Sequence, residues 1–203
     1  MLSINDCYYL LKKEGVPAHI IRHSEKVALA SLYLGCKLKK ETNLELNVPL
    51  LVVGALLHDI KKYEAIIKGV NHALAGYSLL KNLGYPEVAS IIKAHVYLDL
   101  NTLKGPVNEE EIVYYTDKRV KHEEIVGLEE RFSDLKKRYG KTLRSQIRIH
   151  FLEKISYVVE NRIFKGLSFG PDKLLELEKF SKEVRDVFEA CFKGCSTCRR
   201  EVL

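Results

Sequence analysis

Histidine and aspartate side chains recur along the N-terminal part of the chain at positions that could bind metal ions. Five successive predicted helices each carry one such residue or pair on or beside an apolar face: His23, His58 with Asp59, His72, His95 and Asp117. Imidazole and carboxylate groups are the ligands that proteins offer to zinc, iron, manganese and similar divalent ions. If these helices converge on one point, the sequence predicts a metal centre.

His58 and Asp59 stand at the end of the apolar run VPLLVVGALL (48–57). A buried carboxylate is costly unless a cation or hydrogen-bond donors compensate it. Adjacent side chains on a helix diverge by roughly 100°, so this pair is poorly arranged to chelate a single ion. A short carboxylate beside an imidazole is instead suited to reach a second ion or to bridge two.

The order His23, His58-Asp59, Asp117 resembles the H…HD…D signature of the HD-domain superfamily of metal-dependent phosphohydrolases, over about residues 17 to 121. The stretch LLHDIKK is similar to the HDIG variant of that motif. Lys61 stands where the glycine would be, and Lys62 falls on the lysine that often follows. The lysine in place of glycine at position 61 leaves the finer subgroup unassigned, but it does not affect the expected metal site.

The resemblance also implies a ligand set and a chemistry. His72 and His95 match the two additional histidines of the subgroup that binds two metals. The first metal would be held by His23, His58, Asp59 and Asp117, and Asp59 would bridge to a second metal completed by His72 and His95. Two divalent ions, iron or manganese before zinc, nickel, cobalt or magnesium, would lower the pKa of a bridging water and neutralise phosphoryl oxygens.

Four basic residues near these ligands are candidates to bind the substrate. Lys62 is the strongest, as a catalytic group that binds a phosphate oxygen; the weaker candidates flank metal ligands and are Arg22, Lys118 and Arg119. The remaining histidines are interpreted as structural or surface residues: His19, His122 and His150.

The C-terminal segment CFKGCSTCRREVL brings Cys191, Cys195 and Cys198 close together in sequence. This spacing could hold an iron–sulfur cluster or, with a fourth ligand, zinc. Chain ends are often poorly ordered, and nothing else in the sequence is typical of a cluster-binding enzyme. Free thiols or a redox-sensitive tail are therefore the favoured interpretation.

The composition is that of a globular protein. Of 203 residues, 46% are hydrophobic and 30% charged, and 33 Lys and Arg oppose 27 Asp and Glu. This mild basic surplus suits an anionic ligand but is too small and dispersed to indicate nucleic acid. The run 48–57 is too short to span a bilayer, and the N-terminus lacks a signal-peptide pattern. Five cysteines agree with free thiols in a reducing compartment, so we expect a cytoplasmic protein without a membrane partner.

The chain is predicted to be all-α, an HD-domain helical bundle with additional C-terminal helices. We expect a metal-binding core over residues 1–122 and a helical extension over 123–203 packed on it. The predicted helices cover residues 3–15, 17–35, 47–57, 71–84, 86–100, 109–121, 125–135, 143–164 and 174–192. Residues 61–68 are charged and could form a solvated loop, and no alternating strand pattern is visible.

These features predict a phosphohydrolase that uses hydroxide activated by a dinuclear metal centre to cleave a phosphate mono- or diester. The expected partner is a small phosphorylated substrate, with a nucleotide as the first choice. Two alternatives stay open. The same ligands occur in di-iron oxygenases of the HD fold, and a non-catalytic sensing or binding module could retain the metal site. The charged later helices would suit a homodimer or another partner.

Overall fold

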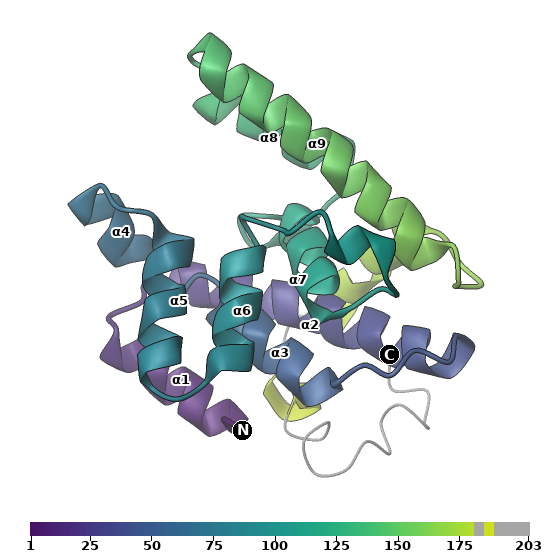
Figure 1. The fold of residues 1–203 in the computed structure, drawn as a ribbon, viewed down its shortest axis with the longest axis horizontal. Helices are drawn as coiled ribbons and strands as arrows, with labels where there is room; N and C mark the ends of the chain where they lie inside the picture. The colour runs from purple at the N-terminus through teal and green to yellow at the C-terminus, as the bar shows by residue number, and fades with distance from the viewer. Residues whose placement is uncertain (181–184, 189–203) are drawn as a thin grey trace.

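The computed structural model describes residues 1–180 and 185–188 of the chain. The fold is all-α, as predicted, with one short hairpin (Figure 1). The helical elements are α1 (Ile4–Lys13), α2 (Ala18–Glu41), α3 (Val48–Leu57), α4 (Lys62–Lys68), α5 (His72–Asn82), α6 (Pro86–Ala94), the 3₁₀ turn η1 (Thr102–Lys104), α7 (Glu109–Lys118), α8 (Leu128–Tyr139), α9 (Leu143–Phe164) and the 3₁₀ segment η2 (Pro171–Phe180). The hairpin strands are β1 (Val120–Lys121) and β2 (Glu124–Ile125).

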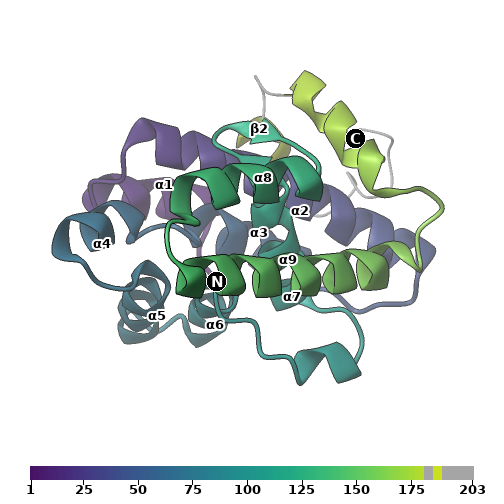
Figure 2. The same cartoon turned by 90° about the horizontal axis from the view of Figure 1, so that it is seen from above.

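Helix α3 is the centre of the bundle. Its sequence is apolar all round, so it has no face that favours water and must be covered on every side. Helices α1, α2, α6 and α7 contact it (Figures 1 and 2). The helix begins at Asn47, whose side chain accepts a hydrogen bond from the Leu50 backbone N–H at 3.1 Å. The C-terminal end of α3 at Leu57 is buried, so His58 and Asp59, which follow it, lie deep inside the bundle.

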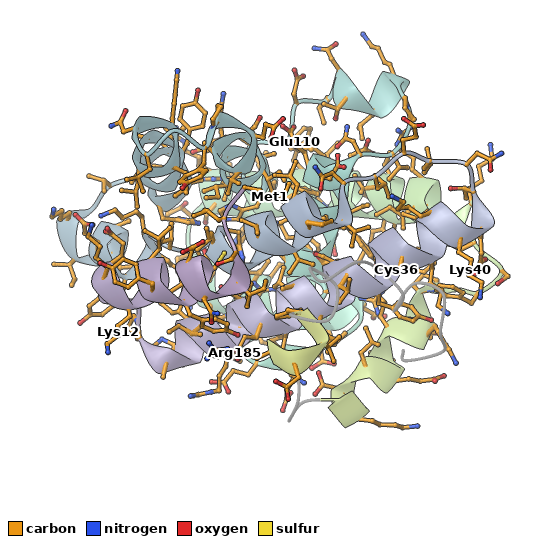
Figure 3. All side chains as sticks on the ribbon, turned by 90° about the horizontal axis from the view of Figure 1, so that it is seen from below. Met1, Lys12, Cys36, Lys40, Glu110 and Arg185 are labelled. Carbon is orange, nitrogen blue, oxygen red and sulfur yellow. The ribbon has the colours of Figure 1, made fainter. Side chains whose placement is uncertain are left out.

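Helices α1 and α2 cover the face opposite to α8 and α9 (Figure 3). Helix α1 begins with the predicted capping box, in which Ser3 and Asp6 satisfy each other's backbone N–H groups. The described segment 185–188 packs against this helix, with the Arg185 guanidinium 4.8 Å from the Tyr8 ring centroid and Phe188 fully buried.

Helices α8 and α9 lie side by side and project beyond the bundle (Figures 1 and 2). We refer to this helix pair as the α8–α9 arm. Its root is fixed by Phe132 on α8 and by Val159 and Ile163 on α9, which are fully buried. The hairpin joins α7 to α8, with Val120 paired to Ile125 and Lys121 to Glu124. The end of the metal-ligand region is therefore connected to the arm by a few residues.

Several element boundaries differ from the sequence prediction. Helix α2 continues past Gly35 to Glu41 because Gly35 is a close contact and not a helix end: a Cβ there would lie 2.6 Å from Leu51 Cδ2. Residues 62–68 form helix α4 in place of a solvated loop, and Gly69 ends it in a left-handed conformation. Helix α7 ends at Lys118, three residues early, where β1 begins.

Two further expectations were wrong in part. The two-residue strands β1 and β2 are too short to show an alternating pattern, so the hairpin could not be recognised in the sequence. The predicted helix over 174–192 is a 3₁₀ segment up to Phe180, and residues 181–184 and 189–192 lie outside the described residues.

The two cysteines among the described residues differ in oxidation state. Cys7 is a free, buried thiol, whereas Cys36 is disulfide-bonded, so the expectation of free thiols is wrong for Cys36. The predictions for Cys191, Cys195 and Cys198 concern residues outside the described part of the chain. Among the described helices, none combines the length and apolar character that a membrane span requires.

The contact between α3 and α6 suggests a first test. A Cβ at Gly54 would lie 2.6 Å from Ile91 Cγ2, so Gly54→Ala would force the two helices apart. Overpacking of this kind costs about 1–3 kcal/mol, and we expect a loss of that size in the free energy of unfolding measured in urea. Gly170→Ala is the matched control, because a Cβ there meets nothing within 4 Å. Equal stability of the two variants would contradict this account of the packing.

Candidate metal centre

Six side chains from five segments converge beside the end of α3. His23 lies in the middle of α2, His72 is the first residue of α5, His95 caps the C-terminus of α6, and Asp117 is in the last turn of α7. His58 and Asp59 are in the turn that follows α3. All are buried except His72, whose side chain is 26% exposed.

One group of ligand atoms surrounds Asp117. Its Oδ1 lies 3.2 Å from His23 Nε2 and 3.6 Å from His58 Nε2. The donor atoms of these three residues lie within 4.8 Å of one another, which is close enough to hold one metal ion. The sequence predicted all three as ligands of the same metal, and the fold brings them together.

A second group surrounds Asp59, which is 1% exposed. Its Oδ2 lies 3.3 Å from His58 Nε2 and 3.8 Å from His23 Nε2, while its Oδ1 lies 3.4 Å from His72 Nε2 and 3.7 Å from His95 Nε2. His58, Asp59 and His95 form another set that could hold a metal ion. The two oxygens of Asp59 thus face different histidines, which is the arrangement that a bridging carboxylate needs.

The backbone fixes the orientation of three of the imidazoles. His58 Nδ1 bonds to the Ala55 carbonyl at 2.7 Å, His95 Nδ1 to the Ile92 carbonyl, and His23 Nδ1 to the carbonyl of His122 at 2.7 Å. A carbonyl can only accept, so each Nδ1 carries the proton and donates it. In the neutral ring Nε2 then presents its lone pair to the centre, as metal-binding histidines require.

Two polar atoms at the centre lack a hydrogen-bond partner. His58 Nε2 and Asp59 Oδ1 are buried and unsatisfied among the described residues, although charged neighbours lie within 4 Å. Leaving such groups unpaired costs about 1–3 kcal/mol each. A divalent cation between them would satisfy both, so the donor set and its unsatisfied atoms fit a metal ion.

Two lysines also act on the carboxylates. Lys62 Nζ lies 2.6 Å from Asp59 Oδ2, and Lys118 Nζ lies 2.7 Å from Asp117 Oδ2. Burial would raise the pKa of both aspartates, but the neighbouring lysines and histidines outweigh it and hold each pKa well below its usual range. The carboxylates are therefore charged near neutral pH, which is the form that binds metal.

The histidines fall into two electrostatic classes. Burial lowers the pKa of His23, His72 and His95, so these rings are neutral near pH 7. Burial acts in the same direction on His58, but Asp59 and Asp117 outweigh it and raise the pKa of His58 to about 9. A metal that binds His58 must therefore displace a proton, because only the neutral ring coordinates.

Residues 20–120 match the family model of the HD domain. The chain belongs to the HD-domain superfamily. Members of this superfamily are generally metal-dependent phosphohydrolases, so the likeness inferred from the motif is confirmed. No curated protein and no solved structure matches the chain.

The HD-domain centre opens into a cavity of about 670 Å³. His23, Asp59, His72 and Lys62 line one side of it. The other side comes from the α8–α9 arm, with lining residues Arg131, Leu135, Arg138, Tyr139, Ser145, Arg148, Ile149 and Leu152. A volume of this size suits a small organic ligand.

Of the four residues predicted to bind substrate, one lines the cavity and three do not. Lys62 lines the cavity, whereas Arg22, Lys118 and Arg119 are not among its lining residues. Arg22 forms an ion pair with Glu123 at 2.6 Å. Lys118 bonds to Asp117 and to the His95 carbonyl, and buried Arg119 donates to the Val126 and Pro171 carbonyls. Being close to a ligand in sequence did not place these cations at the cavity.

Two contributions to the candidate site and its cavity were not predicted from the sequence. The backbone of His122, at φ 55° in the hairpin turn, accepts the hydrogen bond from His23. The arginines of the arm line the cavity, although the later helices contained no motif with an assigned chemistry. A signal was present: no acidic residue occurs between Asp134 and Glu153, a stretch that holds three lysines and three arginines.

The geometry predicts how metal content responds to substitution. His72→Ala should remove mainly one of two ions, because His72 contacts only the Asp59 side of the centre. His58→Ala should reduce the occupancy of both, since its Nε2 faces both carboxylates. Elemental analysis of protein purified without chelator measures this directly. His150→Ala, on the exposed surface of α9, is the control, and at most one ion in the wild-type protein would contradict the dinuclear model.

Proposed function

We propose that the protein is a phosphohydrolase that holds two divalent ions and cleaves a small phosphate mono- or diester. The observation that carries the proposal is the convergence of four imidazoles and two carboxylates, of which His23, Asp59 and His72 line a cavity large enough for an organic phosphate. Membership of the HD-domain superfamily supports the same reaction class.

The proposed ligands divide between two ions. His23, His58 and Asp117 would hold the first ion together with Asp59, and His72 and His95 would hold the second, with Asp59 shared. Bound divalent ions lower the pKa of a coordinated water and neutralise phosphoryl oxygens. Iron or manganese is the expected metal, because imidazoles outnumber carboxylates in the set.

The protein side chains would prepare the site for this chemistry. The Nδ1–carbonyl bonds hold the rings in place, so that little reorganisation is needed when charge develops. Lys62 presents a positive charge at the cavity beside Asp59 and would bind an oxygen of the scissile phosphate. Water supplies the new P–O bond, the ester P–O bond breaks, and the leaving alcohol takes a proton.

A nucleotide is the proposed substrate type, since the cavity combines cationic and apolar lining. We also propose that the functional division follows residues 1–122 and 123–203. The first part would supply the metal ligands and the second part the opposite side of the cavity.

Asp59→Asn tests the mechanism most directly. The amide cannot bridge two cations as a carboxylate does, so we expect phosphatase activity with manganese to fall to background while the circular dichroism spectrum stays helical. Asp172→Asn, at an exposed position in η2, should keep full activity. Activity retained by a folded Asp59→Asn protein would refute the proposed role of this carboxylate.

The oxygen dependence of the reaction separates the proposed class from the oxygenase alternative. A hydrolase should release inorganic phosphate or a nucleoside monophosphate equally fast under anaerobic conditions. Product formed only with O₂ and iron would replace the hydrolase by an oxygenase. Metal binding without turnover across a broad screen of phosphorylated compounds would favour a sensing module.

Lys62→Ala should weaken the reaction without emptying the metal site. It removes a charged contact to phosphate, worth about 1–3 kcal/mol, or roughly tenfold to a hundredfold in kcat/KM. Lys68→Ala is the matched control on the same helix, because Lys68 pairs with Glu64 away from the cavity. Loss of metal from Lys62→Ala, measured by elemental analysis, would show instead that the lysine supports the ligands.

A further inference from the structure

Three arginines of the α8–α9 arm face the same cavity as the metal ligands: Arg131, Arg138 and Arg148. None of them belongs to the HD-domain ligand set or to the sequence motif that identifies the family. They come from two different helices, so no local sequence pattern explains why they share one cavity. A ligand group that binds these arginines would be part of the substrate.

Arg131 is the most informative of the three. It is 8% exposed, yet its buried Nε has no hydrogen-bond partner among the described residues. Its nearest carboxylate contact is Asp134, 3.6 Å from Nη1. It lines the same cavity as Asp59 and Lys62. A buried guanidinium with an unused donor beside a cavity indicates an anionic ligand.

The other two arginines add charge that the lining does not neutralise. Arg138 forms an ion pair with Asp134, the same carboxylate that approaches Arg131. No ion pair is recorded for Arg148 in the described part of the chain. Three guanidinium groups therefore have one carboxylate between them, so two of their positive charges are not compensated by it. A phosphoryl group carries about −1.5 to −2 charges near pH 7 and accepts the paired N–H donors of arginine well.

Apolar side chains line part of the same cavity, together with polar residues such as Glu123, Tyr139 and Ser145. Ile66 reaches the cavity from α4, and Leu135, Ile149 and Leu152 reach it from the arm. These side chains cannot hydrogen-bond, so the part of a ligand that lies over them must be apolar or flat. The cavity thus combines the arginines of the arm, the proposed metal ligands and apolar side chains in one lining.

On this basis we propose that the substrate is an organic bisphosphate, whose scissile phosphate lies at the metal ligands and whose second phosphoryl group binds Arg131, Arg138 and Arg148. This inference rests on the proposed phosphohydrolase function for the first phosphate only. The second phosphate is not cleaved in the same step. Hydrolysis converts one phosphoester and one water into an alcohol and inorganic phosphate, and the arginine-bound group stays attached to the product.

Matched adenosine phosphates test the proposal with the manganese-loaded protein. Adenosine 3′,5′-bisphosphate should have a kcat/KM at least about tenfold higher than adenosine 5′-monophosphate, mainly through a lower KM, because it adds charge-assisted hydrogen bonds. Arg148→Gln should abolish most of this preference and leave hydrolysis of p-nitrophenyl phosphate unchanged. Arg144→Gln, an exposed arginine on the same helix but outside the cavity lining, is the control.

A binding measurement makes the test independent of turnover. Calorimetric titration of adenosine 3′,5′-bisphosphate into chelator-treated protein should show an affinity about tenfold lower for Arg148→Gln than for wild type or Arg144→Gln. Arg131→Lys keeps the charge but loses the planar fork, and should weaken the same binding. This conservative variant guards against misfolding at the buried position.

The outcomes separate the two proposals. Hydrolysis of p-nitrophenyl phosphate without preference for the bisphosphate would overturn this inference and leave the phosphohydrolase function standing. Arginine-dependent binding without hydrolysis of any ester would support the anion site and count against the function. Equal losses in Arg144→Gln and Arg148→Gln would mean that general surface charge, and not this site, binds phosphate, which also overturns the inference.

Discussion

The structure depends on keeping two ionised carboxylates inside an apolar bundle. Asp59 and Asp117 are buried beside the end of α3, where charge is costly unless it is compensated. The surrounding helices meet this requirement in a fixed way, by turning imidazoles and ammonium groups toward the two carboxylates. Helices α2, α5, α6 and α7 each place an imidazole or a carboxylate at or near their ends or middle in this one region.

Close helix packing brings the compensating side chains near the two carboxylates. Gly54 lets α6 approach α3 until Ile91 fills the space of the absent side chain, and the His58 and His95 rings, at the ends of these helices, then lie 4.9 Å apart. Each of these rings is oriented by a carbonyl three residues earlier in its own chain segment. The orientation of these two rings is therefore set by backbone carbonyls, and their separation by the packing of α3 on α6.

The sequence predicted which side chains converge better than it predicted the cavity. His58 and Asp59 were recognisable because a polar pair at the end of an apolar helix needs an explanation, and caps such as Asn47 defined the helix starts. The roles of Gly35 and Arg131 were not predictable, since both depend on which helix lies opposite. Arg22 and Arg119 show the same limit: next to a ligand in sequence, they point to Glu123 and to backbone carbonyls. Motifs specify chemistry at one point, whereas tertiary packing decides what faces it.

The hairpin between α7 and α8 has an evolutionary consequence. Its turn carbonyl at His122 orients His23, while its second strand leads directly into the helix that carries Arg131. Under the proposed function, an insertion there would change the position of the arm and the support of the His23 ring at the same time. On the same proposal, specificity would change most readily through point substitutions on the part of the arm that lines the cavity, which leave this connection unchanged.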